Sequence, residues 1–118
     1  MNNWSGVYLV VQLLSTAVLA DERQLLLVGK GANSCTNYLF ELHMSRINDE
    51  QETVRDYHHW ASGYISAVSM VTPRGEELLR IHRNDNAYIY IRSYCRRHQE
   101  STFVEAVAGY VLDLAGRL

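Results

Sequence analysis

Two cysteines, Cys35 and Cys95, are the only ones in this chain of 118 residues, and 60 positions separate them. Because two cysteines can pair in only one way, a disulfide between them would close a loop over about half of the chain. The chain-entropy argument gives such a loop about 4 kcal/mol of stability, a large share for one small domain. The bond requires an oxidising compartment, and the alternative is two free, buried thiols. Whether it forms therefore depends on whether the chain is exported.

An uncharged apolar run occupies residues 7–20, close to the start of the chain. It contains one glutamine, ends in Val18-Leu19-Ala20, and is followed at once by the charged Asp21. Such a run with small residues at its end predicts a signal peptide over residues 1–20, cleaved after Ala20. The alternatives are an uncleaved anchor, although a membrane span needs about 20 apolar residues, and an N-terminal helix packed on the domain. We therefore expect an exported chain of 98 residues without stable membrane anchoring.

Composition and net charge exclude several classes of protein. Eleven Lys and Arg oppose 13 Asp and Glu, so a net charge of −2 leaves no basic surplus for a nucleic-acid partner. A hydrophobic content of 47% with a single proline excludes a disordered or fibrous chain. The length suits one domain rather than two. We expect a single globular domain.

No residue pattern in the chain predicts catalysis, a metal ion or a cofactor. Cys-x-x-Cys, His-x-x-x-His and Gly-x-Ser-x-Gly are all missing from the sequence. We therefore expect a protein that is not an enzyme and holds no cofactor or metal. Its histidines are expected to be solvated or to cap helices, and histidine is the residue type that can sense pH between about 5 and 7. They are His43, His58, His59, His82 and His98.

Apolar residues recur at helical spacing along the chain, which predicts an all-α fold. Residues 21–33 contain two glycines and are expected to form an irregular lead-in. Ser34 is placed to cap a helix that begins near Cys35. Residues 102–105 read Thr-Phe-Val-Glu, which is a capping box for the last helix, and Gly116 is expected to end that helix.

Between these two helices we expect two more, over residues 52–71 and 86–98. Residues 76–86 form the least clear segment, for which a helical turn is predicted, and residues 88–91 have the composition of a strand. We prefer a helix for the latter because Cys95 then shares its inner face with Ile91. The predicted domain is therefore a small four-helix domain over residues 34–118, in which the disulfide ties the first helix to the third.

The long helix predicted over residues 52–71 carries a motif of aromatic and small residues. Inside a helix a glycine costs about 1 kcal/mol relative to alanine, so we expect Gly63 to allow close approach of a neighbouring helix. Tyr64 and Tyr94 are expected in the core. The complete structural motif is Trp60, Gly63, Tyr64, Ala67 and Tyr94.

The helix predicted over residues 86–98 is rich in tyrosine and arginine. Tyrosine provides a large contact area at low entropy cost, and a cluster of arginines favours an acidic partner. The alternatives are tyrosines at the boundary of a small core, and a helix C-terminus that cations stabilise. Tyr88 and Tyr90 are not expected to point inward together. The candidate partner-binding residues are Tyr88, Tyr90, Arg92, Arg96 and Arg97.

The order of these features resembles the HdeA/HdeB-like small periplasmic proteins of proteobacteria. An export signal precedes Cys35, the stretch from Trp60 to Ala67 follows, and Tyr94-Cys95 precedes a polar tetrad and the last helix. The resemblance covers about residues 34 to 115. It implies an all-α periplasmic protein with one disulfide, which opens at low pH and binds unfolded clients as an acid-stress chaperone.

The element Gly63-Tyr64-Ile65 is also similar to the Rap/Tai-type immunity proteins of type VI secretion. That resemblance implies a small exported, disulfide-bonded protein that neutralises a secreted effector. The sequence therefore predicts a protein partner, either unfolded clients or an effector, with a homodimer as a further alternative.

Overall fold

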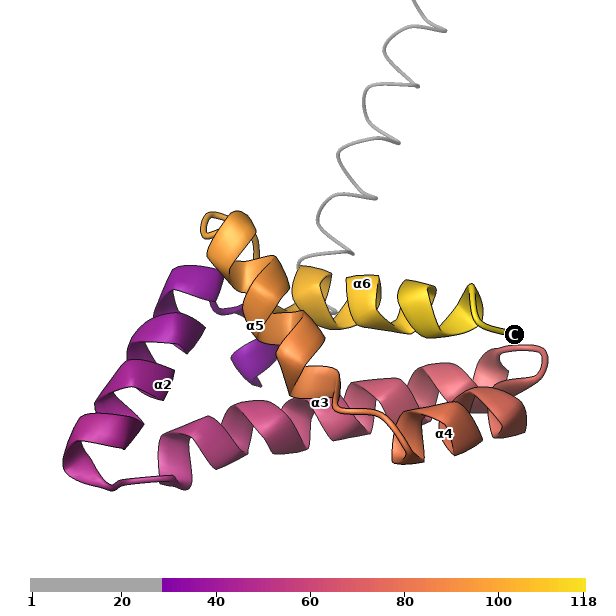
Figure 1. The fold of residues 1–118 in the computed structure, drawn as a ribbon, viewed down its shortest axis with the longest axis horizontal. Helices are drawn as coiled ribbons and strands as arrows, with labels where there is room; N and C mark the ends of the chain where they lie inside the picture. The colour runs from indigo at the N-terminus through magenta and orange to yellow at the C-terminus, as the bar shows by residue number, and fades with distance from the viewer. Residues whose placement is uncertain (1–28) are drawn as a thin grey trace, which may run out of the picture.

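The computed structural model describes residues 29–118, which form five α-helices and one short 3-10 helix (Figure 1). The predicted signal peptide and the lead-in residues 21–28 lie outside the described residues. No strand occurs within residues 29–118, so the all-α prediction is confirmed for this part of the chain. The helices are η1 (Gly29–Ala32), α2 (Cys35–Asn48), α3 (Glu52–Val71), α4 (Gly75–Arg83), α5 (Ala87–Arg97) and α6 (Phe103–Ala115).

The prediction of four helices was wrong by one, because residues 75–83 form a complete helix. Arg74 adopts a left-handed conformation with φ of 62° and turns the chain back on itself after α3. Gly75 then packs so closely on the Ser69 carbonyl that a Cβ atom would overlap it. Figure 1 shows α4 running back alongside the C-terminal half of α3. Burial of Leu78 against the core stabilises this hairpin.

The short helix η1 corrects the prediction that residues 21–33 are irregular, since residues 29–32 are helical. Gly29 has φ of +72°, which favours glycine. Gly31 is buried directly against the Trp60 indole, and a side chain there would overlap the ring. This close approach explains both glycines, and it attaches η1 to the middle of α3.

Helix α3 spans residues 52–71 as predicted, but the expected role of Gly63 was wrong. Gly63 is exposed, and apart from its chain neighbours and the local backbone of α3, no heavy atom of the described chain lies within 4 Å of the position that its Cβ would take. Ala67, which belongs to the predicted motif, is exposed as well, and Val71 is 83% exposed. The buried positions of α3 are Val54, Tyr57, Ala61, Ile65 and Ser69.

Helical caps agree with the sequence predictions. The Ser34 side chain accepts a hydrogen bond from the Asn37 amide at 3.1 Å, and the Thr102 side chain accepts one from Glu105. Asn86 caps α5 in the same way, which confirms a helix rather than a strand for residues 88–91. Gly116 follows α6 with φ of −67°, so the helix ends there without a left-handed turn.

The predicted disulfide between Cys35 and Cys95 is present, and it joins α2 to α5 across a Cα–Cα distance of 4.9 Å. Backbone hydrogen bonds surround it. The Cys35 amide donates to the Ser101 carbonyl at 2.7 Å, and the Phe103 amide donates to the Asn33 carbonyl at 2.7 Å. We call residues 33–36 together with residues 95–103 the crosslinked end.

The core beside the crosslinked end is aromatic. Tyr38, Tyr57 and Phe103 come from three different helices, all are buried, and their ring centroids lie 4.8 to 5.2 Å apart. Edge and tilted arrangements of this kind stabilise beyond the area that they bury. The Tyr57 hydroxyl accepts a hydrogen bond from the Asn33 amide group, so its burial leaves no unpaired polar atom.

No helix described here is both long and apolar enough to cross a membrane.

Candidate functional site

Helix α5 packs on the rest of the domain through two flanks. Tyr88 lies on one flank, where its ring stacks on His58 of α3 with centroids 3.7 Å apart. Tyr90 lies on the other flank, 5.9 Å from the buried Tyr110 of α6. Both tyrosines are half-buried. The expectation that they would not both point inward was wrong, because they reach the core from opposite sides of α5.

Between these flanks, α5 exposes a stripe that carries positive charge. Its exposed residues are Ile89, Ser93, Arg96 and Arg97, and Arg92 is half-buried beside them. The Nε atoms of Arg92 and Arg97 donate to carbonyls one turn back on α5, at 3.2 and 3.3 Å. None of the three arginines makes an ion pair within residues 29–118. The structure thus brings the predicted partner-binding residues onto one helix but divides them between a charged stripe and two aromatic flanks.

The first of two hydrogen bonds between a histidine and a buried tyrosine joins α2 to α3. The hydroxyl of Tyr38, which is fully buried, lies 3.2 Å from Nε2 of His58. Burial raises the pKa of Tyr38 to about 12, so its hydroxyl stays protonated. Burial, together with the positive Arg92 and the neighbouring His59, lowers the pKa of His58. The histidine is therefore held in its neutral form at neutral pH.

The second contact joins α4 to α6 at the opposite end of the domain. Nδ1 of His82 lies 2.8 Å from the hydroxyl of Tyr110, another fully buried tyrosine. Burial lowers the pKa of His82, and the carboxylate of Asp85 opposes this effect. Burial and the nearby Asp85 raise the pKa of Tyr110. Arg117 bridges Asp85 at 3.2 Å and Asp113 at 2.5 Å, which ties the chain end to this cluster.

These contacts join two fully buried tyrosines to histidines whose pKa values burial lowers. The histidines were expected to be solvated or to cap helices, and for His58 and His82 that expectation was wrong. A charged imidazolium is a hydrogen-bond donor at both nitrogens and loses hydration in a partly buried site. Protonation of either histidine therefore weakens the packing of α3 on α2 or of α4 on α6.

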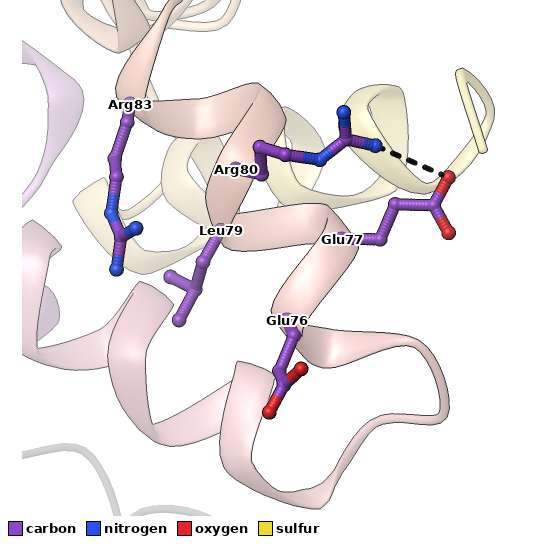
Figure 2. Close-up of a pocket in the computed structure, with 5 residues that line it drawn as sticks. All are labelled: Glu76, Glu77, Leu79, Arg80 and Arg83. Atoms are coloured by element: carbon purple, nitrogen blue, oxygen red, sulfur yellow. Dashed lines mark ion pairs between the residues drawn. The ribbon is translucent and has the colours of Figure 1, made fainter.

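A shallow surface depression of about 620 Å³ lies along α4. Figure 2 shows Glu77 and Arg80 reaching toward one another on one side of the helix, whereas Leu79 and Arg83 point to the other side. Glu77 pairs with Arg80 at 3.6 Å and with Arg74 at 2.7 Å. Glu77 lies in the first turn of α4, where the helix dipole stabilises a carboxylate. Its ion pairs with Arg74 and Arg80 are therefore explained by stabilisation of the N-terminus of α4.

The structural motif predicted from sequence is divided between half-buried aromatic rings and two exposed small residues, Gly63 and Ala67. Trp60 and Tyr64 are half-buried, and their rings stack with centroids 5.5 Å apart. Tyr94 is half-buried against His98 at 4.6 Å. The residues that sequence reasoning missed are the hydrogen-bond partners Tyr38 and Tyr110, which lie 20 and 28 positions from their histidines.

Within residues 29–118, no group of three or more His, Cys, Asp or Glu side chains is arranged to hold a metal ion.

Comparison of the chain with family models, curated proteins and solved structures found no match.

Proposed function

We propose that this chain is a non-enzymatic, exported protein-binding domain of the periplasm. It opens in acid and then binds unfolded proteins, as its resemblance to the HdeA/HdeB-like proteins implies. The observation that carries the proposal is the pair of histidine–tyrosine contacts. Each joins two helices, each uses a fully buried tyrosine, and each depends on a neutral histidine. Together they make the packing of α3 and α4 sensitive to acid.

Charge adds to this sensitivity below the usual range of carboxyl pKa values. With the 13 Asp and Glu neutral, all 11 Lys and Arg and all five His are positive. A chain with so large a positive charge repels itself, which favours open states. The ion pairs that Arg117 makes with Asp85 and Asp113 are lost under the same conditions.

Opening would expose apolar surface while keeping the chain from unfolding completely. The side chains of Leu78, Tyr110 and Leu114 are fully buried in the closed domain, on the two helices that the His82–Tyr110 contact joins, and they offer the surface that an unfolded client would contact. The disulfide between Cys35 and Cys95 holds α2 and α5 together throughout. A chaperone of this kind needs both properties, because it must open reversibly.

The test is suppression of client aggregation near pH 3, about one unit below the usual carboxyl pKa. A client enzyme that aggregates in acid is mixed with the purified chain, and light scattering is followed at pH 3 and pH 7. We expect suppression at stoichiometric excess at pH 3 and none at pH 7. Undiminished aggregation at pH 3 would remove the chaperone function.

A second candidate function is that of an immunity protein that neutralises a type VI secretion effector. It is favoured by the composition of α5, because tyrosine and arginine dominate the strongest contacts of protein interfaces, and Arg92, Arg96 and Arg97 make no ion pair within residues 29–118. It predicts a toxin gene beside the gene for this chain and a tight one-to-one complex of the two products. Failure of the purified pair to bind would exclude it.

Both functions require export. N-terminal sequencing of the chain recovered from expressing cells is expected to begin at Asp21, and recovery of chains that retain Met1 would contradict export by a cleaved signal.

A further inference from the structure

A groove runs along the N-terminal half of α5, beside the charged stripe. Its volume is about 350 Å³, and its walls include Ile89, Tyr90 and Ser93 of α5. Ile89 is 59% exposed, although isoleucine is among the residues most often buried. Asp85 and Arg117, which pair at 3.2 Å, line the same groove. The groove has room for a large apolar side chain.

The positive charge of α5 begins where this groove ends. Arg96 and Arg97 follow Ser93 by three and four residues, which places them about 4.5 to 6 Å further along the helix axis. Their side chains are exposed, and within residues 29–118 no carboxylate lies within ion-pair distance of them. Helix α5 itself contains no acidic residue. An apolar groove is thus followed by two uncompensated guanidinium groups on one face.

We propose that this face of α5 binds an acidic, amphipathic segment of another protein at neutral pH. An apolar side chain of that segment enters the groove beside Ile89 and Tyr90, and carboxylates one to two helical turns away pair with Arg96 and Arg97. Guanidinium groups match carboxylates in bidentate geometry, which fixes the register of the bound segment. The site deepens the second function proposed above by naming the chemistry of its partner, and it does not depend on opening in acid.

Charge complementarity selects this occupant over others. A symmetric dimer through α5 would bring the arginines of two copies face to face, and like charges across an interface are unfavourable. A nucleic acid would require a larger basic surface than three arginines on a chain of net charge −2. An acidic protein segment meets both the charge and the apolar groove.

The test uses a displayed library of random peptides, selected at pH 7 against the full chain. We expect the enriched peptides to carry a large apolar residue followed within two helical turns by at least two Asp or Glu. Binding of an enriched peptide should weaken about tenfold in the R96E/R97E variant, since two exposed charge pairs are lost. It should also weaken in I89D and fall with rising salt concentration.

The matched control is R55E/R83E, which reverses two exposed arginines on α3 and α4 that make no ion pair in the described chain. This control should bind the peptides as the wild type does.

A peptide with its acidic residues changed to arginine should regain binding to R96E/R97E, which shows that the variant is folded. Enriched peptides without acidic residues, or equal loss in the control, would overturn the proposal. So would a dimer in light scattering that R96E/R97E abolishes, because a second copy would then be the occupant. The chaperone assay near pH 3 is independent of all these outcomes.

Discussion

At the crosslinked end, α2 and α5 are joined by a disulfide, and backbone hydrogen bonds tie the start of α2 to the segment that leads into α6. At the opposite end, which we call the hairpin end (α4 with residues 110–118), the helices meet through groups that titrate. His82 contacts Tyr110, and Arg117 pairs with Asp85 and Asp113. The bonds around Cys35 and Phe103 involve no titratable side chain. Acid is therefore expected to weaken the contacts at the hairpin end more than those at the crosslinked end.

This difference shows how a small domain divides its stability between permanent and conditional contacts. A disulfide across 60 residues lowers the entropy of the unfolded chain at every pH. Contacts through neutral histidines and carboxylates hold only above the pKa values of those groups. We therefore expect the hairpin end to open in acid while the crosslinked end stays closed.

The largest expected effect is loss of the disulfide. Replacing Cys35 and Cys95 together by alanine should lower the free energy of unfolding by about 4 kcal/mol, measured by urea denaturation at pH 7. Reduction of the wild type by a thiol should have a similar effect. A loss below about 1 kcal/mol would mean that the crosslinked end is held without the bond.

Two glycines give the next comparison. Gly75→Ala should lower the free energy of unfolding by about 2 kcal/mol, because the new methyl group would overlap the Ser69 carbonyl. Gly63→Ala should raise it by about 1 kcal/mol, because the site is open and helical. Thermal denaturation of both variants checks this. Destabilisation by Gly63→Ala would instead indicate that a neighbouring helix packs closely on Gly63, as the sequence predicted.

The two tyrosine hydroxyls test whether the two histidine–tyrosine hydrogen bonds act independently of one another. Tyr38→Phe and Tyr110→Phe each remove one hydrogen bond to a histidine, and each should cost about 1 kcal/mol at pH 7. In hydrogen exchange, Tyr110→Phe should reduce the protection of α4, whereas Tyr38→Phe should leave α4 unchanged. Equal effects of both variants on α4 would show that the two contacts are not independent.

The smallest effects concern the pH dependence of stability. Burial lowers the pKa values of His58 and His82 in the folded chain, so the unfolded chain binds protons more readily. The stability that they contribute is therefore complete above about pH 6.5 and is lost as the pH falls through the folded-state pKa.

His58→Gln and His82→Gln should each flatten the fall in unfolding free energy between about pH 7 and pH 5. His43→Gln, at an exposed position, is the matched control and should leave the slope unchanged. If neither variant changes the slope of unfolding free energy against pH, the two histidines do not contribute to the acid response.

Local signals in the sequence predicted much of the fold. Ser34 and Thr102 cap their helices as expected, and the bounds of α3 follow from its apolar spacing. Helix α4 was missed because it is short, with a single buried large side chain, Leu78, and because its start depends on the contact of Gly75 with Ser69. That contact is tertiary, and no local pattern shows it.

The candidate site was less predictable for the same reason. The composition of α5 marked Arg96 and Arg97, but which way Tyr88 and Tyr90 turn depends on α3 and α6. The histidine–tyrosine contacts join residues far apart in sequence, and a histidine in a helical pattern does not show whether a tyrosine hydroxyl lies beside it. Only the packed structure shows which histidines are shielded.

The most direct test of the account is hydrogen exchange of backbone amides at pH 7 and again near pH 4, below the ordinary histidine pKa. Protection factors, corrected for the intrinsic effect of pH, should fall in α4 and in the C-terminal half of α6 while residues 33–36 and 95–103 remain protected. Equal loss of protection at both ends, or earlier loss at the crosslinked end, would contradict an opening that begins at the hairpin end.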